Sequence, residues 1–269
     1  MNLNPFARDP FGHNYLLKRA VVFWFGAIAW YRFNIANKTV ITGGEILKNM
    51  PDRNVLFVSN HQTYFADVAA MYQVFNCSKW KIYNRINFFW HVFNPKINVY
   101  FIAAKETMKA GFLPKLFAYA GSVSIKRTWR EAGKTVDRGV DPTDISNIKM
   151  AIQNGWVITF PQGTTKPFVK GRRGTAHLIK ELEPIVIPVV IDGFRRAFDK
   201  KGLFLKKKGC ELKVKFKEPL DLDYKQSSNA ILNQIMDAIE QSDDFVWSPQ
   251  ESSSEASQRT SEETSEVAE

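Results

Sequence analysis

The sequence predicts an α/β protein: a single layered domain with a mostly parallel central sheet flanked by helices. Continuously apolar runs, such as VLFV at residues 55–58 and PIVIPVV at residues 184–190, are typical of strands buried on both faces. Longer amphipathic stretches separate these runs, as helices separate parallel strands. With 269 residues, 45% of them hydrophobic and 24% charged, the chain is long enough for one large α/β domain or two small ones.

Residues 1–36 are predicted to form a helical segment that associates with a membrane. Residues 20–31, AVVFWFGAIAWY, are continuously apolar, but a helix needs about 20 such residues to span a bilayer. Basic residues flank the run, and Trp24 and Trp30 within it are of the kind favoured at a lipid–water boundary. We expect residues 15–33 to form a helix lying in one leaflet. A buried core helix is the alternative.

Residues 37–248 are predicted to form the domain itself. Strands are expected at 55–58, 79–83, 100–104, 123–126, 156–161, 184–190 and 211–216, the last at an edge of the sheet. Helices are expected at 68–76, 112–119, 147–153 and 230–241. The aromatic segment 86–99 is expected mainly to pack in the core.

Charge is distributed unevenly along the chain. Residues 249–269 contain six glutamates and one arginine, so this tail carries −5 and the residues before it carry +15 of the total of +10. The Ser/Glu-rich tail has too little apolar content to pack, and we expect it to be disordered. The basic remainder indicates an anionic partner, either nucleic acid or an anionic membrane surface.

Cysteine and histidine usage indicates neither a disulfide framework nor a metal site. Cys77 and Cys210 are far apart, and the four histidines are scattered. We expect no metal and no cofactor, and a reduced compartment on the cytosolic side.

His61 and Asp67 are the predicted catalytic residues. They follow the strand expected at 55–58, at the end where a parallel sheet places its chemistry. A histidine removes a proton near neutral pH, and a carboxylate against its far nitrogen fixes the tautomer. Residues six apart do not share a helix face, so the two can pair only across a turn. As the alternative, Asp67 caps the N-terminus of the helix at 68–76.

Four ordered blocks of the chain resemble the motifs of one enzyme family. They are SNHQ at 59–62 with Asp67 shortly after, GSVSIKR at 121–127, FPQGT at 160–164 and VIPV at 186–189. Together they are similar to the glycerolipid acyltransferases of the bacterial 1-acylglycerol-3-phosphate acyltransferase type, over roughly residues 50–195.

The resemblance implies an activity. A membrane-associated enzyme on the cytoplasmic face, with the bacterial inner membrane as the implied membrane, would move a fatty acyl group from acyl-CoA or acyl carrier protein to the hydroxyl of a lysolipid. His61 would act as the base and Asp67 would orient it. The first-choice acceptor is 1-acylglycerol-3-phosphate, which gives phosphatidic acid. A basic module that binds membranes or nucleic acid without catalysis does not explain the four blocks, so we expect no nucleic-acid partner.

Three positions depart from the family pattern. Five residues instead of four separate His61 from Asp67, with Ala66 at the usual acidic place, so one extra residue must bulge out. Gln162 replaces the usual Glu, and Thr165 stands where an Arg commonly holds the phosphate of the acceptor. An acceptor without a phosphate, such as an N-acyl amino-acid lipid with a free hydroxyl, is therefore the alternative.

Substrate contacts are predicted beyond the catalytic pair. Arg127 is the first candidate for an anion, because its planar fork binds two oxygens at once. The turn from Gln162 to Thr165 can form an anion-binding nest, with Gly163 turning the backbone and Thr164 adding a hydroxyl. Arg172, in the cationic run 166–173, can supply a further charge. The Lys105 ammonium and the Gly163 N–H are candidate donors to the oxyanion. An acyl chain can be walled by Phe88, Phe89, Trp90 and Phe93.

Overall fold

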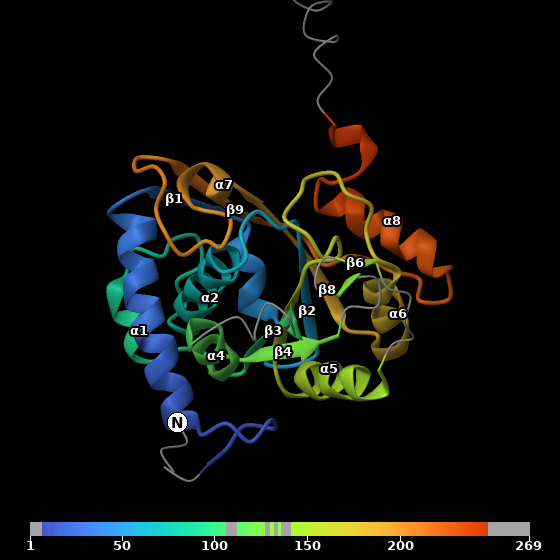
Figure 1. Cartoon of the computed structure of the whole chain (residues 1–269), viewed down its shortest axis with the longest axis horizontal. Coiled ribbons are helices and arrows are strands. Elements are labelled where there is room, and N and C mark those ends of the chain that lie inside the picture. The colour runs from blue at the N-terminus through green and yellow to red at the C-terminus, as the bar shows by residue number, and fades with distance from the viewer. Residues whose placement is uncertain (1–6, 106–111, 127–129, 132–133, 136–140, 247–269) are drawn as a thin grey trace, which may run out of the picture.

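A seven-stranded sheet forms the centre of the molecule (Figure 1). The computed structural model describes residues 7–105, 112–126, 130–131, 134–135 and 141–246, so Arg127 and the tail at 249–269 lie outside the described residues. The strand order is β1-β9-β8-β2-β7-β3-β4. The strands are β1 Lys38–Thr42, β2 Val55–Ser59, β3 Val99–Ala104, β4 Ser122–Ile125, β7 Trp156–Thr159, β8 Ile185–Asp192 and β9 Glu211–Phe216. Arg130–Glu131 (β5) and Lys134–Thr135 (β6) form a separate two-stranded sheet.

The sheet is mostly parallel, as the sequence predicts. Strands β8, β2, β7, β3 and β4 all run in one direction. Strand β9 pairs antiparallel with β8 and parallel with β1, so these two strands reverse the direction at one side of the sheet. The prediction of an edge position for β9 is wrong, because β1 covers it. The alternation along β9 arises because Lys213 and Lys215 face solvent on one side of the strand.

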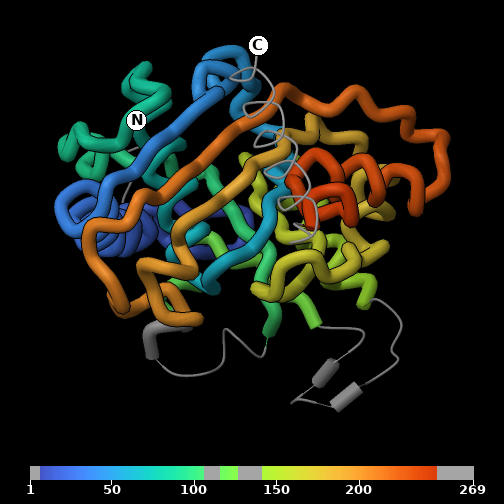
Figure 2. The backbone as a smooth tube through the Cα atoms, turned by 90° about the horizontal axis from the view of Figure 1, so that it is seen from above, coloured from blue at the N-terminus to red at the C-terminus, as the bar shows by residue number. Residues whose placement is uncertain are grey.

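Helices cover both faces of the sheet (Figure 1). Alternate residues of β2 point to opposite sides: Phe57 packs in the core beneath α1 and α2, and Leu56 packs in the core beneath α5, α6 and α8. This two-sided burial is the reason for the continuously apolar strand. The helices are α1 Tyr15–Asn34, α2 Ala66–Lys79, α4 Phe112–Tyr119, α5 Pro142–Asn154, α6 Arg173–Leu182, α7 Phe194–Ala197 and α8 Ser228–Ala238, with 3₁₀ turns η1 Gly44–Asn49, η2 Phe89–Phe93 and η3 Asp243–Phe245. Seen from above, β1 and β9 run side by side although they come from opposite ends of the chain (Figure 2).

Helix α1 has one buried and one exposed side. Val22, Ala29 and Phe33 pack in the same core as β2, so this segment is part of the domain along that side. Lys18, one of the basic residues that precede the apolar run, is fully buried and does not face a lipid surface. Burial lowers the pKa of Lys18 to about 8, although the Asp9 carboxylate, 3.3 Å from Nζ, favours its charged form. No helix in the described part of the chain combines the length and hydropathy needed to cross a membrane.

One local prediction after α2 is wrong, and a second is confirmed in part. Residues 79–83 do not form a strand, because α2 continues to Lys79 and an irregular segment follows it. In the aromatic segment 86–99, Ile86 and Val99 are buried in the core as predicted. Its turn η2 instead packs on the outside of α1, where the rings of Phe23 and Phe93 lie 5.0 Å apart. Trp90 and Phe93 are exposed there.

Candidate active site

The candidate site lies where two neighbouring strands end. Strands β2 and β7 pair in register, and Val58 lies opposite Thr159. The side chain of Asn60 links the chain after β2 to the end of β8. Its Nδ2 donates to the Ile191 carbonyl at 2.8 Å, and its Oδ1 accepts from the Ile191 N–H at 2.7 Å. This two-way bond holds the turn that follows at the carboxyl edge of the sheet.

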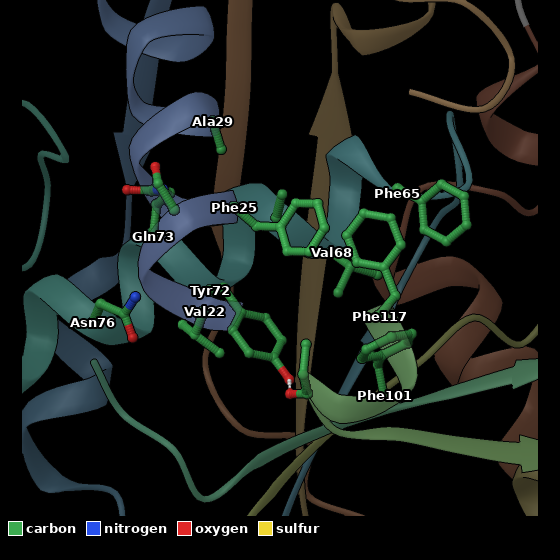
Figure 3. A pocket seen from close by; sticks show the side chains of 13 residues that line it. Val22, Phe25, Ala29, Phe65, Val68, Tyr72, Gln73, Asn76, Phe101 and Phe117 are labelled. Carbon is green, nitrogen blue, oxygen red and sulfur yellow. Dashed lines mark hydrogen bonds between the residues drawn. The ribbon is translucent and has the colours of Figure 1, made fainter. Parts of the chain in front are cut away.

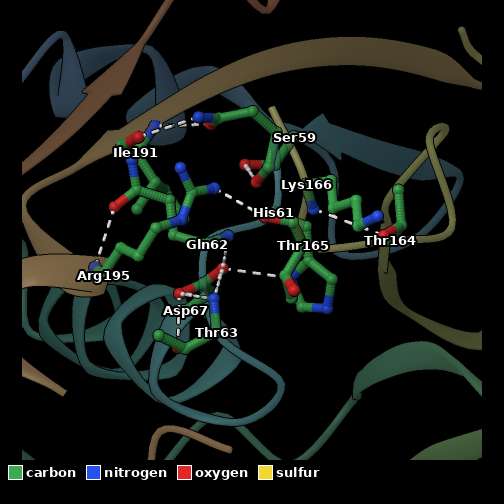
Figure 4. A network of polar contacts seen from close by, with 11 residues as sticks. Ser59, His61, Gln62, Thr63, Asp67, Thr164, Thr165, Lys166, Ile191 and Arg195 are labelled. Atoms are coloured by element: carbon green, nitrogen blue, oxygen red, sulfur yellow. Dashed lines mark hydrogen bonds and ion pairs between the residues drawn. The ribbon is translucent and has the colours of Figure 1, made fainter. Parts of the chain in front are cut away.

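His61, in that turn, lies next to Asp67, which follows it in the chain (Figure 4). Nδ1 of His61 is 3.0 Å from Oδ2 of Asp67. The Asp67 side chain is fully buried, and it also accepts hydrogen bonds from the backbone of Gln62 at 2.6 Å and from the backbone and hydroxyl of Thr63. These donors satisfy a carboxylate that would otherwise be costly to bury.

The turn accommodates the extra residue between the two side chains. Helix α2 begins at Ala66, so His61 precedes the helix and Asp67 stands in its first turn. The cap position is Phe65, without a side-chain hydrogen bond. The alternative role of Asp67 as a helix cap is therefore wrong, because its carboxylate turns back to the preceding N–H groups of Gln62 and Thr63.

The second ring nitrogen of His61 is available for chemistry. With Nδ1 facing a carboxylate, the proton of the neutral ring belongs on Nδ1, and Nε2 is left as an acceptor. No hydrogen bond to Nε2 is present within the described ranges, and the side chain is 12% exposed. Phe160, directly after β7, stacks on the imidazole with 3.9 Å between ring centroids and an interplanar angle of 20°. The site therefore holds an oriented imidazole with one open nitrogen.

The turn after β7 uses its polar groups internally. Gln162 is buried, and its amide donates to the Val169 carbonyl at 3.0 Å and to Oε1 of Gln241 at 3.1 Å. Both amide protons of Gln162 are therefore engaged inside the protein, and its contact with substrate stays a prediction. Gly163 adopts the expected left-handed backbone, with φ of 62°, but its N–H donates to the Phe160 carbonyl at 2.9 Å. That amide is therefore not free to stabilise an oxyanion.

The two threonines that follow also face protein groups. Thr164 is half-buried, and its hydroxyl accepts from the Lys166 N–H at 3.3 Å. Thr165 is buried, and its carbonyl accepts from the guanidinium of Arg195 at 2.6 Å. The Gly163 N–H is therefore not available to an anion-binding nest, and the nest stays a prediction for the rest of the turn.

Arg195 is the residue that the sequence did not single out for the site. It lies on α7, its N–H donates to Oε1 of Gln62 at 3.1 Å, and its guanidinium reaches Thr165 (Figure 4). It therefore joins the turn after β2 to the turn after β7. No carboxylate pairs with Arg195 in the part of the chain that is described. The nearby Asp192 carboxylate forms an ion pair with Arg196 instead, with Oδ2 3.1 Å from Nη2. In the sequence, the two adjacent arginines at 195 and 196, which follow the fourth motif block, could have indicated a cation at the site.

The structure shows no contact between the dyad and either of the other described cations that the sequence predicts for the site, Lys105 and Arg172. Lys105 directly follows β3 and is half-buried. Arg172 is exposed before α6, and its N–H donates to the Pro161 carbonyl at 2.8 Å. Arg127 lies outside the described residues. Among the described side chains, no group of three or more His, Cys, Asp or Glu is arranged to hold a metal ion.

Comparisons with known proteins identify the family and the fold of the chain. Residues 40–192 match the protein family described as Acyltransferase. A crystal structure of the 1-acyl-sn-glycerophosphate (LPA) acyltransferase PlsC from Thermotoga maritima is similar in fold, with a TM-score of 0.52 and 22% identity, over 82% of this chain and 76% of that chain. The comparison with curated protein sequences gives no significant match.

Proposed function

Since this chain belongs to the acyltransferase family, we propose that it moves a fatty acyl group from a thioester to the hydroxyl of a lysolipid, with His61 as the general base. The observation that carries this proposal is the imidazole with Nδ1 bound to a buried carboxylate and Nε2 open. A base of this kind suits proton removal from an alcohol near neutral pH.

The proposed reaction needs no covalent enzyme intermediate. Nε2 of His61 takes the hydroxyl proton while the oxygen attacks the thioester carbonyl, and Asp67 stabilises the imidazolium that forms. The tetrahedral oxyanion then collapses, the C–S bond breaks, and the thiolate leaves with the proton from the imidazolium. Because the Gly163 N–H is engaged, Lys105 remains the proposed oxyanion donor. The donor substrate is acyl-CoA or acyl carrier protein.

An apolar cavity lined in part by the first turn of α2 is the proposed slot for the acyl chain (Figure 3). It lies between α1, α2 and α4, and Phe65, two residues before Asp67, is one of its walls. The polar side chains in its lining are already bonded, as Gln73 donates to the Gly26 carbonyl at 2.7 Å. The interior therefore suits a hydrocarbon chain. Phe88, Phe89, Trp90 and Phe93 do not line this cavity, so they are not part of the slot proposed here.

A continuous aromatic surface is the proposed site of membrane attachment. Trp24, Trp90 and Phe93 are more than half exposed, and Phe23 joins them, with ring centroids 5.3 Å from Trp24 and 5.0 Å from Phe93. Exposed aromatic rings of this kind bind at the lipid–water boundary. The proposed membrane is the bacterial inner membrane at its cytoplasmic face, which the family resemblance implies.

The proposed acceptor is 1-acylglycerol-3-phosphate, which gives phosphatidic acid. Arg195 supplies a cation at the site, and Arg172 and Arg127 are further candidates from the sequence. A phosphate-free N-acyl amino-acid lipid is the second candidate, favoured by Gln162 and Thr165 at positions where the related enzymes carry charged residues. Its carboxylate would meet the same cations.

One assay tests the function and separates the two acceptors. The purified protein is incubated with palmitoyl-CoA or palmitoyl-acyl carrier protein and a panel containing both lysolipids, and the products are identified by mass. We expect phosphatidic acid, with no product from His61→Ala and normal product from His177→Ala, an exposed histidine on α6. Transfer by His61→Ala at the wild-type rate would refute the assignment of the base.

A further inference from the structure

A tight hairpin after α7 lies against the turn that carries the dyad. Residues 198–205 form it, with Phe198 and Leu205 paired as an antiparallel bridge. Asp199 closes the loop: its carboxylate accepts from the N–H groups of Leu203 at 2.8 Å and Phe204 at 2.9 Å. Phe198 is buried against Phe33 and Phe194 in the core. The hairpin is therefore anchored at its base and closed by internal bonds.

The tip of this hairpin holds the segment that contains the extra residue. The Lys200 carbonyl accepts from the Tyr64 N–H at 3.1 Å, and the Lys201 carbonyl accepts from the Phe65 N–H at 3.0 Å. These two N–H groups precede α2, where no side chain caps the helix. Two successive residues of the five between His61 and Asp67 are thus fixed by a loop more than 130 positions away in the sequence.

Gly202 fits the tip against the turn at the level of single atoms. Its backbone is left-handed, with φ of +75°, and a Cβ there would lie 2.5 Å from the Ala66 nitrogen and 2.8 Å from the Thr63 hydroxyl. That hydroxyl donates to Oδ1 of Asp67 at 2.7 Å. A side chain at position 202 would therefore displace the group that orients the catalytic carboxylate.

We infer that the hairpin 198–205 is a positioning element for the dyad, and that Gly202 is a positioning residue through which the hairpin keeps Asp67 against His61 across the longer spacing. The inference rests on the proposed role of the dyad and names what holds it. A carboxylate misplaced by a fraction of an ångström orients the imidazole poorly, and errors of this size reduce turnover strongly.

Gly202→Ala and Gly209→Ala form a matched pair of variants. Gly209 has nearly the same backbone, with φ of +73°, but nothing lies within 4 Å of its added Cβ. Both variants carry the strain of a left-handed alanine, and only Gly202→Ala presses on the dyad turn. The first measurement needs no substrate: NMR of ¹⁵N-histidine-labelled protein should show the hydrogen-bonded Nδ1–H of His61 in wild type and Gly209→Ala, and its loss in Gly202→Ala.

The second measurement is acyl transfer from palmitoyl-CoA to 1-acylglycerol-3-phosphate. Gly202→Ala should lower kcat by about tenfold or more with KM nearly unchanged, and Gly209→Ala should stay within about twofold of wild type. In an Asp67→Asn background, Gly202→Ala should have no further effect on kcat, because the carboxylate that the Thr63 hydroxyl orients is already absent. Asp199→Ala, which loosens the hairpin without a clash, should show the same pattern at about threefold.

The possible results separate this inference from the proposed function. A folded Gly202→Ala protein with the wild-type Nδ1–H signal and kcat would overturn the inference, as would equal losses in Gly209→Ala. If Gly202→Ala does not fold, a wild-type result for Asp199→Ala would overturn it. Full turnover by Asp67→Asn would instead refute the dyad, whatever the hairpin variants do.

Discussion

The turns after β2 and β7 occupy equivalent places and do different work. Both follow buried strands that pair in register, and both begin at the carboxyl edge of the sheet. In the turn after β2, the backbone N–H groups converge on Asp67 and leave the tip of His61 open. In the turn after β7, the Gln162 side-chain amide and the Gly163 N–H both donate hydrogen bonds to backbone carbonyls of the protein.

This difference shows that position at a sheet edge does not decide a role. A reactive group needs one face held and the other free, and only the first turn provides this. The second turn contributes the Phe160 ring behind the imidazole and the Thr165 carbonyl that receives Arg195. The first turn is thus the chemical part of the proposed site, and the second supports it.

His61→Ala should have the largest effect, because it removes the base. We expect a fall in kcat of about 10²–10⁴-fold, the usual contribution of a positioned general base. Steady-state acyl transfer measures it. Phe160→Leu, which keeps an apolar contact in the second turn, should lose far less, and equal losses in the two variants would remove the distinction between the turns.

Asp67→Asn should have the second largest effect. The amide keeps the size of the side chain but presents a donor as well as an acceptor, so it no longer selects the tautomer with the proton on Nδ1. We expect a fall in kcat of about a hundredfold at unchanged KM. Thermal unfolding of the variant provides the control, because a fully unfolded protein would lose activity for a trivial reason.

Arg195→Gln tests whether the guanidinium held at the second turn binds the anionic group of the acceptor. We expect the KM for 1-acylglycerol-3-phosphate to rise about tenfold, the scale of one charge-assisted hydrogen bond, with kcat little changed. Lys208→Gln, which removes a charge from an exposed position outside the site, is the matched control. The same rise in both variants would indicate a general surface effect.

Gln162→Ala should have the smallest effect on activity. It leaves the Val169 carbonyl and the Gln241 side chain without their donor, so the free energy of unfolding should fall by about 1–2 kcal/mol. Urea denaturation measures this loss. A kcat reduced as much as in Asp67→Asn, in a protein of unchanged stability, would instead support the predicted contact between Gln162 and substrate.

Most strands and helices could be predicted from local sequence. Residues 211–216 alternate in polarity, and this alternation reports which residues face solvent, not which strand lies beside them. Residues 79–83 also alternate in the sequence, but Lys79, Trp80 and Lys81 are all exposed and no strand forms there. Strand β9 is interior because β1 pairs with it from the other end of the chain. Lys18 and Gln162 were assigned by residue type, and burial then gave both of them protein partners.

The sequence by itself determined the α/β class, the acyltransferase family and the place of His61 at the end of a buried strand, because these depend on local composition and on short ordered motifs. Only the tertiary structure decided that a five-residue spacing still closes the dyad, that Arg195 reaches Thr165, and that a hairpin around Gly202 supports the turn. Arg195 and Thr165 are 30 positions apart, and the hairpin contacts a turn more than 130 positions away. The dyad residues are only six positions apart, but that hairpin contacts the segment between them. The periodicity of a single segment contains no information about such contacts.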